Sequence, residues 1–141
     1  MIADTLAKFL EFITAHYVLS GIFITIVVLL IMQQSRNSGR NVSSRELTAM
    51  VNRDEACVLD IRTKKDFTSG HIVGSLNISS DQLKDRMSEL EKHKNKTIIV
   101  VCASGINAGA ACSELKKAGF TVARLSGGIT GWRSENLPVV K

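Results

Sequence analysis

The sequence predicts an α/β domain with a central parallel sheet covered on both faces, preceded by one transmembrane helix. Three observations lead to this prediction. Residues 98–101 are a short, continuous β-branched run, which is typical of a strand buried on both faces. Similar runs alternate with helical patterns over the last hundred or so residues, as parallel sheets require. Residues 12–35 carry no formal charge and are long enough to cross a bilayer as a helix.

Size and composition leave room for one domain and an appendage. The chain has 141 residues, a net charge of +5 and three cysteines. The cysteines are scattered and odd in number, so we expect no disulfide framework and a reducing compartment. No cysteine and histidine have metal-ligand spacing, and we expect neither a metal nor a cofactor. The excess of lysine and arginine is spread along the chain, which indicates a solvated surface and not a nucleic-acid site.

The uncharged stretch 12–35 predicts a single-pass membrane anchor. A cleaved signal peptide is the first alternative, but Asp4 and Glu11 stand where such a peptide is basic, and the apolar run is too long. A buried core helix is the second alternative, but it should show a polar face, and residues 22–32 show almost none. We therefore expect an N-terminal segment 1–35 that contains the helix.

The charges on either side of this helix predict its orientation. Arg36, Arg40 and Arg45 follow it, whereas acidic residues balance the positive charges that precede it. Because positive residues stay on the cytoplasmic side, the N-terminus should face outward. We expect a polar linker at 36–42 and then a domain, 43–141, in the cytoplasm at the inner membrane.

The predicted domain begins with a helix that Ser43 and Ser44 start, with Leu47 on its buried face. Residues 56–61 form a buried strand that places Cys57 in the core. The remaining elements follow in order: a polar turn with a short helical piece at 62–72, a strand at 75–78, a helix after 79–81, a strand at 120–125, and a last helix around Trp132.

Cys102 follows the central strand 98–101 at the edge of the sheet where ligands bind in parallel sheets. The small residues after it let the backbone curve, and a helical pattern begins at Ile106 and stops at Gly119. A thiol in such a turn faces backbone N–H groups and the positive end of a helix dipole. These surroundings stabilise the nucleophilic thiolate. The residues alone leave a second interpretation open, that of a buried structural cysteine.

Three segments together resemble the rhodanese family of sulfurtransferases over residues 42–141. The first is 58–62 with 66–67 and 70–77, the second is the loop 102–107, and the third is 127–132 with 137–139. With the N-terminal helix, the chain is similar to membrane-anchored members of that family. The resemblance implies a rhodanese-like three-layer domain with a central parallel sheet.

The resemblance also implies the chemistry of the loop. Cys102 would attack a sulfane sulfur, for instance that of thiosulfate or of a persulfide donor, and pass it as a persulfide to a thiol acceptor. The backbone amides of the substrate-binding loop would hold the anionic substrate; this loop comprises Ala103, Ser104, Gly105, Ile106 and Asn107.

Four further residues would support the loop. Asp60 could bond loop amides, and Arg62 could pair with Asp66 and hold the turn 70–72. His71 would be structural in that turn, with a catalytic base as the alternative role.

The sequence departs from the family pattern within the loop. Asn107 stands where many active members have an arginine, and Ala103 replaces a residue that is often basic or polar. These departures predict weak thiosulfate turnover or another donor. Phosphatase activity is not expected, because Ala108 occupies the position where the related phosphatases have an arginine. Cys112 lies on a buried helical stripe, with a resolving cysteine for Cys102 as the alternative.

Two functions from different classes follow. The first is a membrane-tethered sulfurtransferase that acts through Cys102. The second is a catalytically weak adaptor of the same fold that docks a partner protein at the cytoplasmic membrane face, where tethering raises its local concentration.

Overall fold

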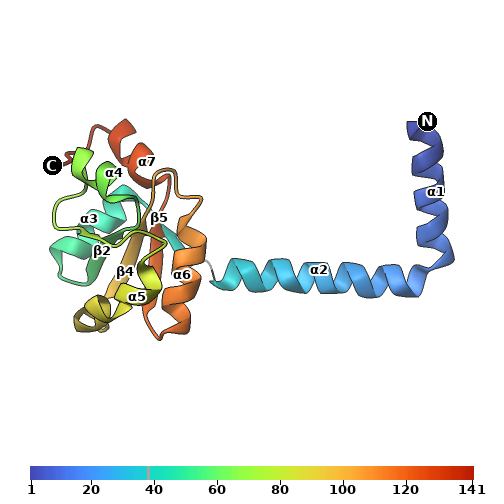
Figure 1. Cartoon of the computed structure of the whole chain (residues 1–141), viewed down its shortest axis with the longest axis horizontal. Helices are drawn as coiled ribbons and strands as arrows, with labels where there is room; N and C mark the ends of the chain where they lie inside the picture. Colours follow the sequence, from blue (N-terminus) through green and yellow to red (C-terminus); the bar gives the residue numbers. More distant parts are fainter. Residues whose placement is uncertain (38) are drawn as a thin grey trace. The chain divides into compact units, whose positions relative to one another are not determined.

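A computed structural model describes residues 1–37 and 39–141 (Figure 1). The chain divides into two compact units, Met1–Arg36 and Asn37–Lys141. The predicted linker 36–42 is partly wrong, because Arg40–Val42 form an edge strand, β1. Ser38, in the same predicted linker, lies outside the described residues.

The N-terminal unit contains two helices where the sequence predicted one. Helix α1 covers Ile2–Ala15 and helix α2 covers Tyr17–Asn37. Between them His16 leaves the helical region, with φ −120° and ψ 44°. Its N–H still bonds the carbonyl of Phe12 at 3.0 Å, while its own carbonyl accepts from Ser20 at 2.9 Å. One helical ladder therefore ends at this residue and a second ladder begins.

The axes of these two helices differ by 97°. Within the described part of the chain, neither helix by itself has the length and apolar composition of a membrane span. Ile2–Ala15 and Tyr17–Gln33 meet those criteria only together, as a bent pair. The expectation of one continuous helix from Phe12 onward is thus corrected, because the helical series of backbone hydrogen bonds breaks at His16.

The C-terminal unit contains the predicted parallel sheet. Its strand order is β1-β5-β4-β2-β3, and every pair within it is parallel. The other four strands are β2 Ala56–Asp60, β3 Leu76–Asn77, β4 Thr97–Val101 and β5 Thr121–Leu125. The sequence did not reveal β1, because this short edge strand buries only Val42.

Helices cover both faces of this sheet (Figure 1). They are α3 Ser44–Asn52, α4 Lys64–Ser69, α5 Leu83–Arg86, a 3₁₀-helix at Met87–His93, α6 Ala108–Lys117 and α7 Gly128–Ser134. Ser43 and Thr63 cap α3 and α4 by accepting the N–H of the residue three positions on. The single helix predicted after 79–81 is instead one α-helical turn followed by the 3₁₀-helix.

Alternation along β4 divides the core into two layers. Ile98 and Val100 pack with side chains of α5, the 3₁₀-helix and α6. Ile99 and Val101 pack on the opposite face with side chains of α3 and α7. All four are fully buried, as expected of a central strand in a parallel sheet. The three-layer architecture around a central parallel sheet that the sequence predicted is therefore confirmed.

The ends of β2 and β4 lie side by side at one edge of the sheet. Asp60 pairs in register with Val101, and the N–H of Ile61 donates to the Val101 carbonyl at 2.9 Å. From here β2 connects to β3 on one side, whereas β4 connects to β5 on the other. Ligands bind in the crevice at such a reversal of strand order in open α/β sheets.

Candidate functional site

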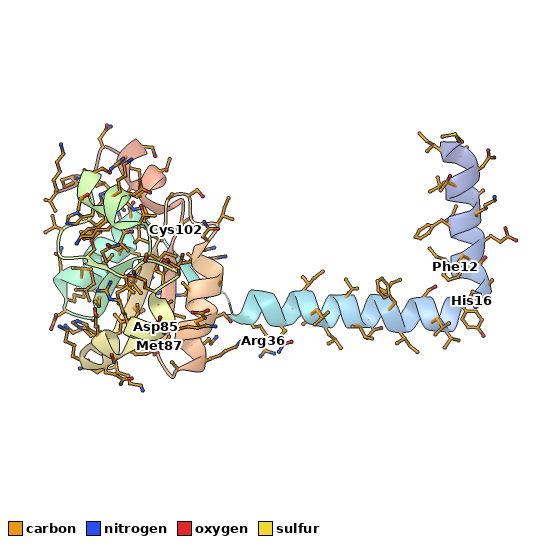
Figure 2. All side chains as sticks on the ribbon, in the orientation of Figure 1. Phe12, His16, Arg36, Asp85, Met87 and Cys102 are labelled. Carbon is orange, nitrogen blue, oxygen red and sulfur yellow. The ribbon has the colours of Figure 1, made fainter. Side chains whose placement is uncertain are left out.

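Cys102 is the residue that follows β4 at this reversal point. The residue is 4% exposed, and the Gly105 N–H donates to its Sγ at 2.8 Å. Figure 2 shows Cys102 near the start of α6. The sulfur atom therefore lies inside the turn of its own loop, where a backbone dipole is directed at it.

The loop is longer than the helical pattern suggested. Helix α6 begins at Ala108 and not at Ile106, so Ile106 and Asn107 belong to the loop. Ile106 is 81% exposed, and Asn107 precedes α6 without a side-chain capping bond. Gly105 has φ +87°, a conformation in which residues with a side chain are strained.

The first turn of α7 holds the carbonyl side of the loop. The Ile129 N–H donates to the Cys102 carbonyl at 2.9 Å. The Ala103 carbonyl accepts from the N–H of Thr130 at 3.0 Å and from its hydroxyl at 2.8 Å. In a planar trans peptide the N–H points opposite to the carbonyl of the same peptide unit. The N–H groups of Ala103 and Ser104 therefore point away from α7.

Gly128 permits this close approach of α7 to the loop. It has φ +57°, and a Cβ atom there would lie 2.8 Å from the Gly105 nitrogen and 2.9 Å from the Ala103 carbonyl carbon, in contact with the Cys102 carbonyl oxygen. Sequence reasoning recognised residues 127–128 as the start of a helix and as part of the segment 127–132 that carries the family resemblance. It missed Gly128 and Thr130 as parts of the site, since their contacts join segments some 25 residues apart, a separation that local patterns do not cover.

A buried ion pair occupies the neighbouring end of β2. The Arg62 guanidinium contacts Asp60 through Nη2 at 2.7 Å and through Nε at 3.0 Å, and the Arg62 N–H also donates to this carboxylate at 3.0 Å. The predicted Arg62–Asp66 pair is wrong, because Asp66 lies exposed in the first turn of α4. The amide that Asp60 binds belongs to Arg62 and not to the cysteine loop.

The expected contact between Arg62 and the turn at Gly70 is present. Arg62 Nη2 donates to the Gly70 carbonyl at 2.8 Å, and Arg133 Nη2 reaches the same oxygen at 3.3 Å. Asn77 Nδ2 donates to the backbone carbonyls of Asp60 and Arg62, at 3.1 and 3.0 Å. Sequence reasoning assigned no such role to Arg133 or Asn77. These contacts fix the chain that leaves β2.

His71 lies in the turn at Gly70. Its Nδ1 donates to the Phe67 carbonyl at 2.8 Å, and its ring stacks on that of Phe67 with centroids 3.8 Å apart. Its backbone pairs with that of Val140. These contacts join α4 to the C-terminal segment, and all of them are structural.

The other two cysteines lie in the core. Burial raises the pKa of the Cys57 thiol, with Lys96 and Lys92 opposing the shift. Burial also raises the pKa of Cys112 to about 11, and its thiol donates to the Ala123 carbonyl at 3.7 Å. Both thiols are held in the protonated, unreactive form at neutral pH. Cys102 is thus the cysteine that the fold places at a ligand-binding edge.

Chemically, this arrangement offers a nucleophile and backbone dipoles. No charged side chain occurs between Ala103 and Asn107. Within residues 1–37 and 39–141, no cluster of three His, Cys, Asp or Glu side chains could hold a metal ion. An anionic ligand at Cys102 would thus meet N–H groups of the loop and the start of α6.

Comparison with known proteins identifies relatives of the whole chain and of its C-terminal unit. The family model described as "Rhodanese-like domain" matches residues 43–135. The "Uncharacterized protein YibN" of Escherichia coli K12 is 38% identical over 139 residues, which cover 95% of this chain and 97% of that protein.

Two solved structures are similar to the C-terminal unit. A rhodanese-related protein from Thermoplasma volcanium is 32% identical, with a TM-score of 0.63, over 72% of this chain and 97% of that one. A thiosulfate sulfurtransferase from Pseudomonas aeruginosa is 24% identical, with a TM-score of 0.66, over 75% of this chain and 21% of that one. At that identity the second likeness shows the fold alone.

Proposed function

The chain belongs to the rhodanese family, and we propose from that premise that it is a sulfurtransferase that carries sulfur as a persulfide on Cys102. The observation that supports this most strongly is the position of Cys102 at the C-terminal end of β4, where the Gly105 N–H donates to its Sγ at 2.8 Å. All three cysteines are buried, but Cys102 follows the C-terminal end of a strand, where a small shift of its loop would expose the sulfur to a substrate, whereas Cys57 lies within β2 and Cys112 within α6.

The proposed reaction has two displacements at sulfur. The Cys102 thiolate attacks the outer sulfur of thiosulfate, the sulfur–sulfur bond breaks, and sulfite leaves with the electron pair. With a glutathione persulfide donor the leaving group is the glutathione thiolate, and the proton of the donor stays on the new persulfide. An acceptor thiolate then attacks the outer sulfur of protonated Cys102 persulfide, and the Cys102 thiolate leaves.

The loop would stabilise the persulfide through backbone dipoles alone. The N–H groups of Ala103 and Ser104 point away from α7, and that of Gly105 already faces the sulfur. Position 107 carries an asparagine and not a cation, so the loop stabilises a dianionic donor less well than a neutral or singly charged one. A persulfide donor therefore suits this loop better than thiosulfate.

The proposal includes membrane attachment through α2. The apolar part of this helix, residues 17–32, is about 24 Å long at 1.5 Å per residue. A hydrocarbon core is about 30 Å thick, so a span through α2 requires local thinning of the bilayer or the polar end of the helix to reach into the headgroup region. The arginines at 36, 40 and 45 follow its apolar part, which favours a cytoplasmic rhodanese domain and an outward N-terminus. The lipid bilayer is then a partner of the chain at the inner membrane.

A transfer assay on the full chain in detergent tests the sulfurtransferase proposal. Thiosulfate or glutathione persulfide is the donor, cyanide is the acceptor, and thiocyanate is measured. We expect transfer with the parent chain, background with Cys102→Ser, and full transfer with Cys57→Ala, which removes a core thiol. Equal transfer by the parent chain and Cys102→Ser would overturn the proposal.

A second candidate function is a membrane-tethered adaptor for a partner protein. It is favoured by the uncharged loop and by Ile106, whose side chain lies 81% exposed beside the cysteine. In cells, this function predicts that Cys102→Ser keeps the phenotype of the parent chain and that removal of residues 1–36 abolishes it. The sulfurtransferase predicts that both changes abolish it.

A further inference from the structure

Helix α1 has two chemically different sides. Asp4, Lys8 and Glu11 recur at a spacing of four and three residues, so they share one stripe of the helix. Large apolar side chains occupy the other side, namely Ile2, Leu6, Phe9, Phe12 and Ile13. No residue of α1 is buried, and Phe9 is 59% exposed. The apolar side therefore needs an environment that the described residues do not supply.

The bend at His16 aims this apolar side in a definite direction. Phe9, Phe12 and Ile13 line a hollow of about 420 Å³ together with Leu19, Phe23 and other residues of α2. Figure 2 shows Phe12 and His16 at the corner between the two helices. The hollow is the inner side of a 97° corner, so the apolar side of α1 faces the side toward which α2 extends.

We propose that α1 is an interfacial helix that lies on the outer surface of the membrane, with its apolar side in the lipid. This inference rests on the proposed membrane attachment through α2. If α2 crosses the bilayer, a 97° bend places α1 along the surface. The acidic stripe with Lys8 then faces water, while Phe9 and its neighbours enter the boundary between headgroups and acyl chains. His16 and Tyr17 come to lie at that boundary, where aromatic side chains are enriched.

Two features favour lipid over a protein as the occupant. The hollow that joins the apolar side of α1 to α2 is lined by apolar side chains apart from Ser20, so one apolar environment covers both surfaces. The charges of α1 also balance, because Asp4 and Glu11 oppose Lys8 and the N-terminal amine, which lies 3.5 Å from Asp4. Binding should therefore come from apolar burial, and anionic lipid should not be required.

Tryptophan variants of the full chain in phosphatidylcholine vesicles test the inference. Phe9→Trp probes the apolar side, and Glu11→Trp, about 200° further around the helix, is its matched control. Spin-labelled lipids quench from near the headgroup or from near the end of the acyl chain. Trp132 lies in the core of the rhodanese domain, so the signal of the parent chain is subtracted as background.

We expect the shallow label to quench Phe9→Trp about threefold more than Glu11→Trp, and more than the deep label does. Addition of anionic lipid should leave this difference unchanged. Equal quenching of the two variants would overturn the inference, because α1 would then have no preferred side. Absence of quenching at Phe9→Trp would overturn it as well, since water or a protein partner would cover that side.

A third variant, Val28→Trp near the middle of α2, separates this inference from the proposed anchor. Quenching of Val28→Trp by the deep label with none at Phe9→Trp would reject the interfacial helix and keep the anchor. Absence of quenching at Val28→Trp would reject both.

Discussion

The ends of β2 and β4 lie next to each other at one edge of the sheet, yet they use opposite chemistry. At the end of β2, Asp60 and Arg62 are buried charges bound to each other and to backbone groups. At the end of β4, Cys102 is followed by a loop without a charged side chain, in which a backbone N–H faces the sulfur. The charges at the first end are bound to protein groups, and the uncharged end carries the nucleophile.

This difference separates structural from chemical roles at the site. Arg62 uses its Nε and Nη2 for contacts with Asp60 and with the Gly70 carbonyl, and these contacts fix the turn at Gly70. The cysteine loop gains its shape from α7, whose N–H groups bind the Cys102 and Ala103 carbonyls. Changes at the β2 end should therefore alter mainly stability, and changes at the β4 end mainly sulfur transfer.

The largest effect is expected from Arg62→Ala. This change leaves the Asp60 carboxylate buried without its cation, which typically costs about 3–5 kcal/mol in the free energy of unfolding. Urea unfolding of the full chain in detergent measures the loss. Arg86→Ala is the matched control, because Arg86 pairs with Glu89 at the surface, where an ion pair contributes little to stability. Equal losses in the two variants would contradict a structural role for the Asp60–Arg62 pair.

Gly128→Ala should reduce sulfur transfer about a hundredfold. The added Cβ would collide with the Cys102 carbonyl and the Gly105 nitrogen, and a displacement of about 1 Å at a reacting centre is enough for such a loss. Gly131→Ala is the control within the same helix, since its Cβ would meet only ordinary contact distances. The rate of thiocyanate formation distinguishes them. Similar rates for both variants would show that α7 does not shape the loop.

Asn107→Arg should raise the rate with thiosulfate about tenfold. The variant supplies the cation that the loop lacks, and a charge-assisted hydrogen bond favours a dianion. The rate with glutathione persulfide should change much less. Asn107→Gln, which adds length without charge, should leave both rates near those of the parent chain. If Asn107→Arg raised neither rate, the backbone dipoles would already supply all the stabilisation the donor can use.

The core thiol of Cys112 should make the stability of the domain depend on pH above pH 9. Its folded-state pKa of about 11 lies above the value near 9 of an unfolded cysteine, so the folded chain holds the proton more tightly. Its contribution to stability is complete below pH 9 and is lost as the pH rises to 11. The free energy of unfolding of the parent chain, measured with urea, should fall over that range by up to about 3 kcal/mol. That of Cys112→Ala should fall less. Parallel pH profiles would contradict the burial of this thiol.

Much of the domain was predictable because its signals are local. The β-branched run in β4, the cap at Ser43 and the position of Cys102 after a buried strand depend on neighbouring residues. The contacts of Thr130 with the cysteine loop, and of Asn77 and Arg133 around β2, join distant segments and leave no periodic signal. Arg62 was assigned to Asp66, four residues on, because the fold at the end of β2 that turns it back to Asp60 was not predictable.

The N-terminal unit shows the same limit. Composition predicted one apolar helix over residues 12–35, but nothing in it marks His16 as the residue where one helix ends and the next begins, and α1 before that residue was missed. The strand β1 was missed because a three-residue edge strand with two exposed positions has no buried alternation to detect.

Intact mass spectrometry of the full chain after incubation with glutathione persulfide tests the central claim most directly. We predict an added mass of about 32 Da, one sulfur atom, that a reductant removes and that Cys102→Ser does not acquire. An unchanged mass of the folded parent chain, or the same gain in Cys102→Ser, would contradict sulfur carriage by this uncharged loop.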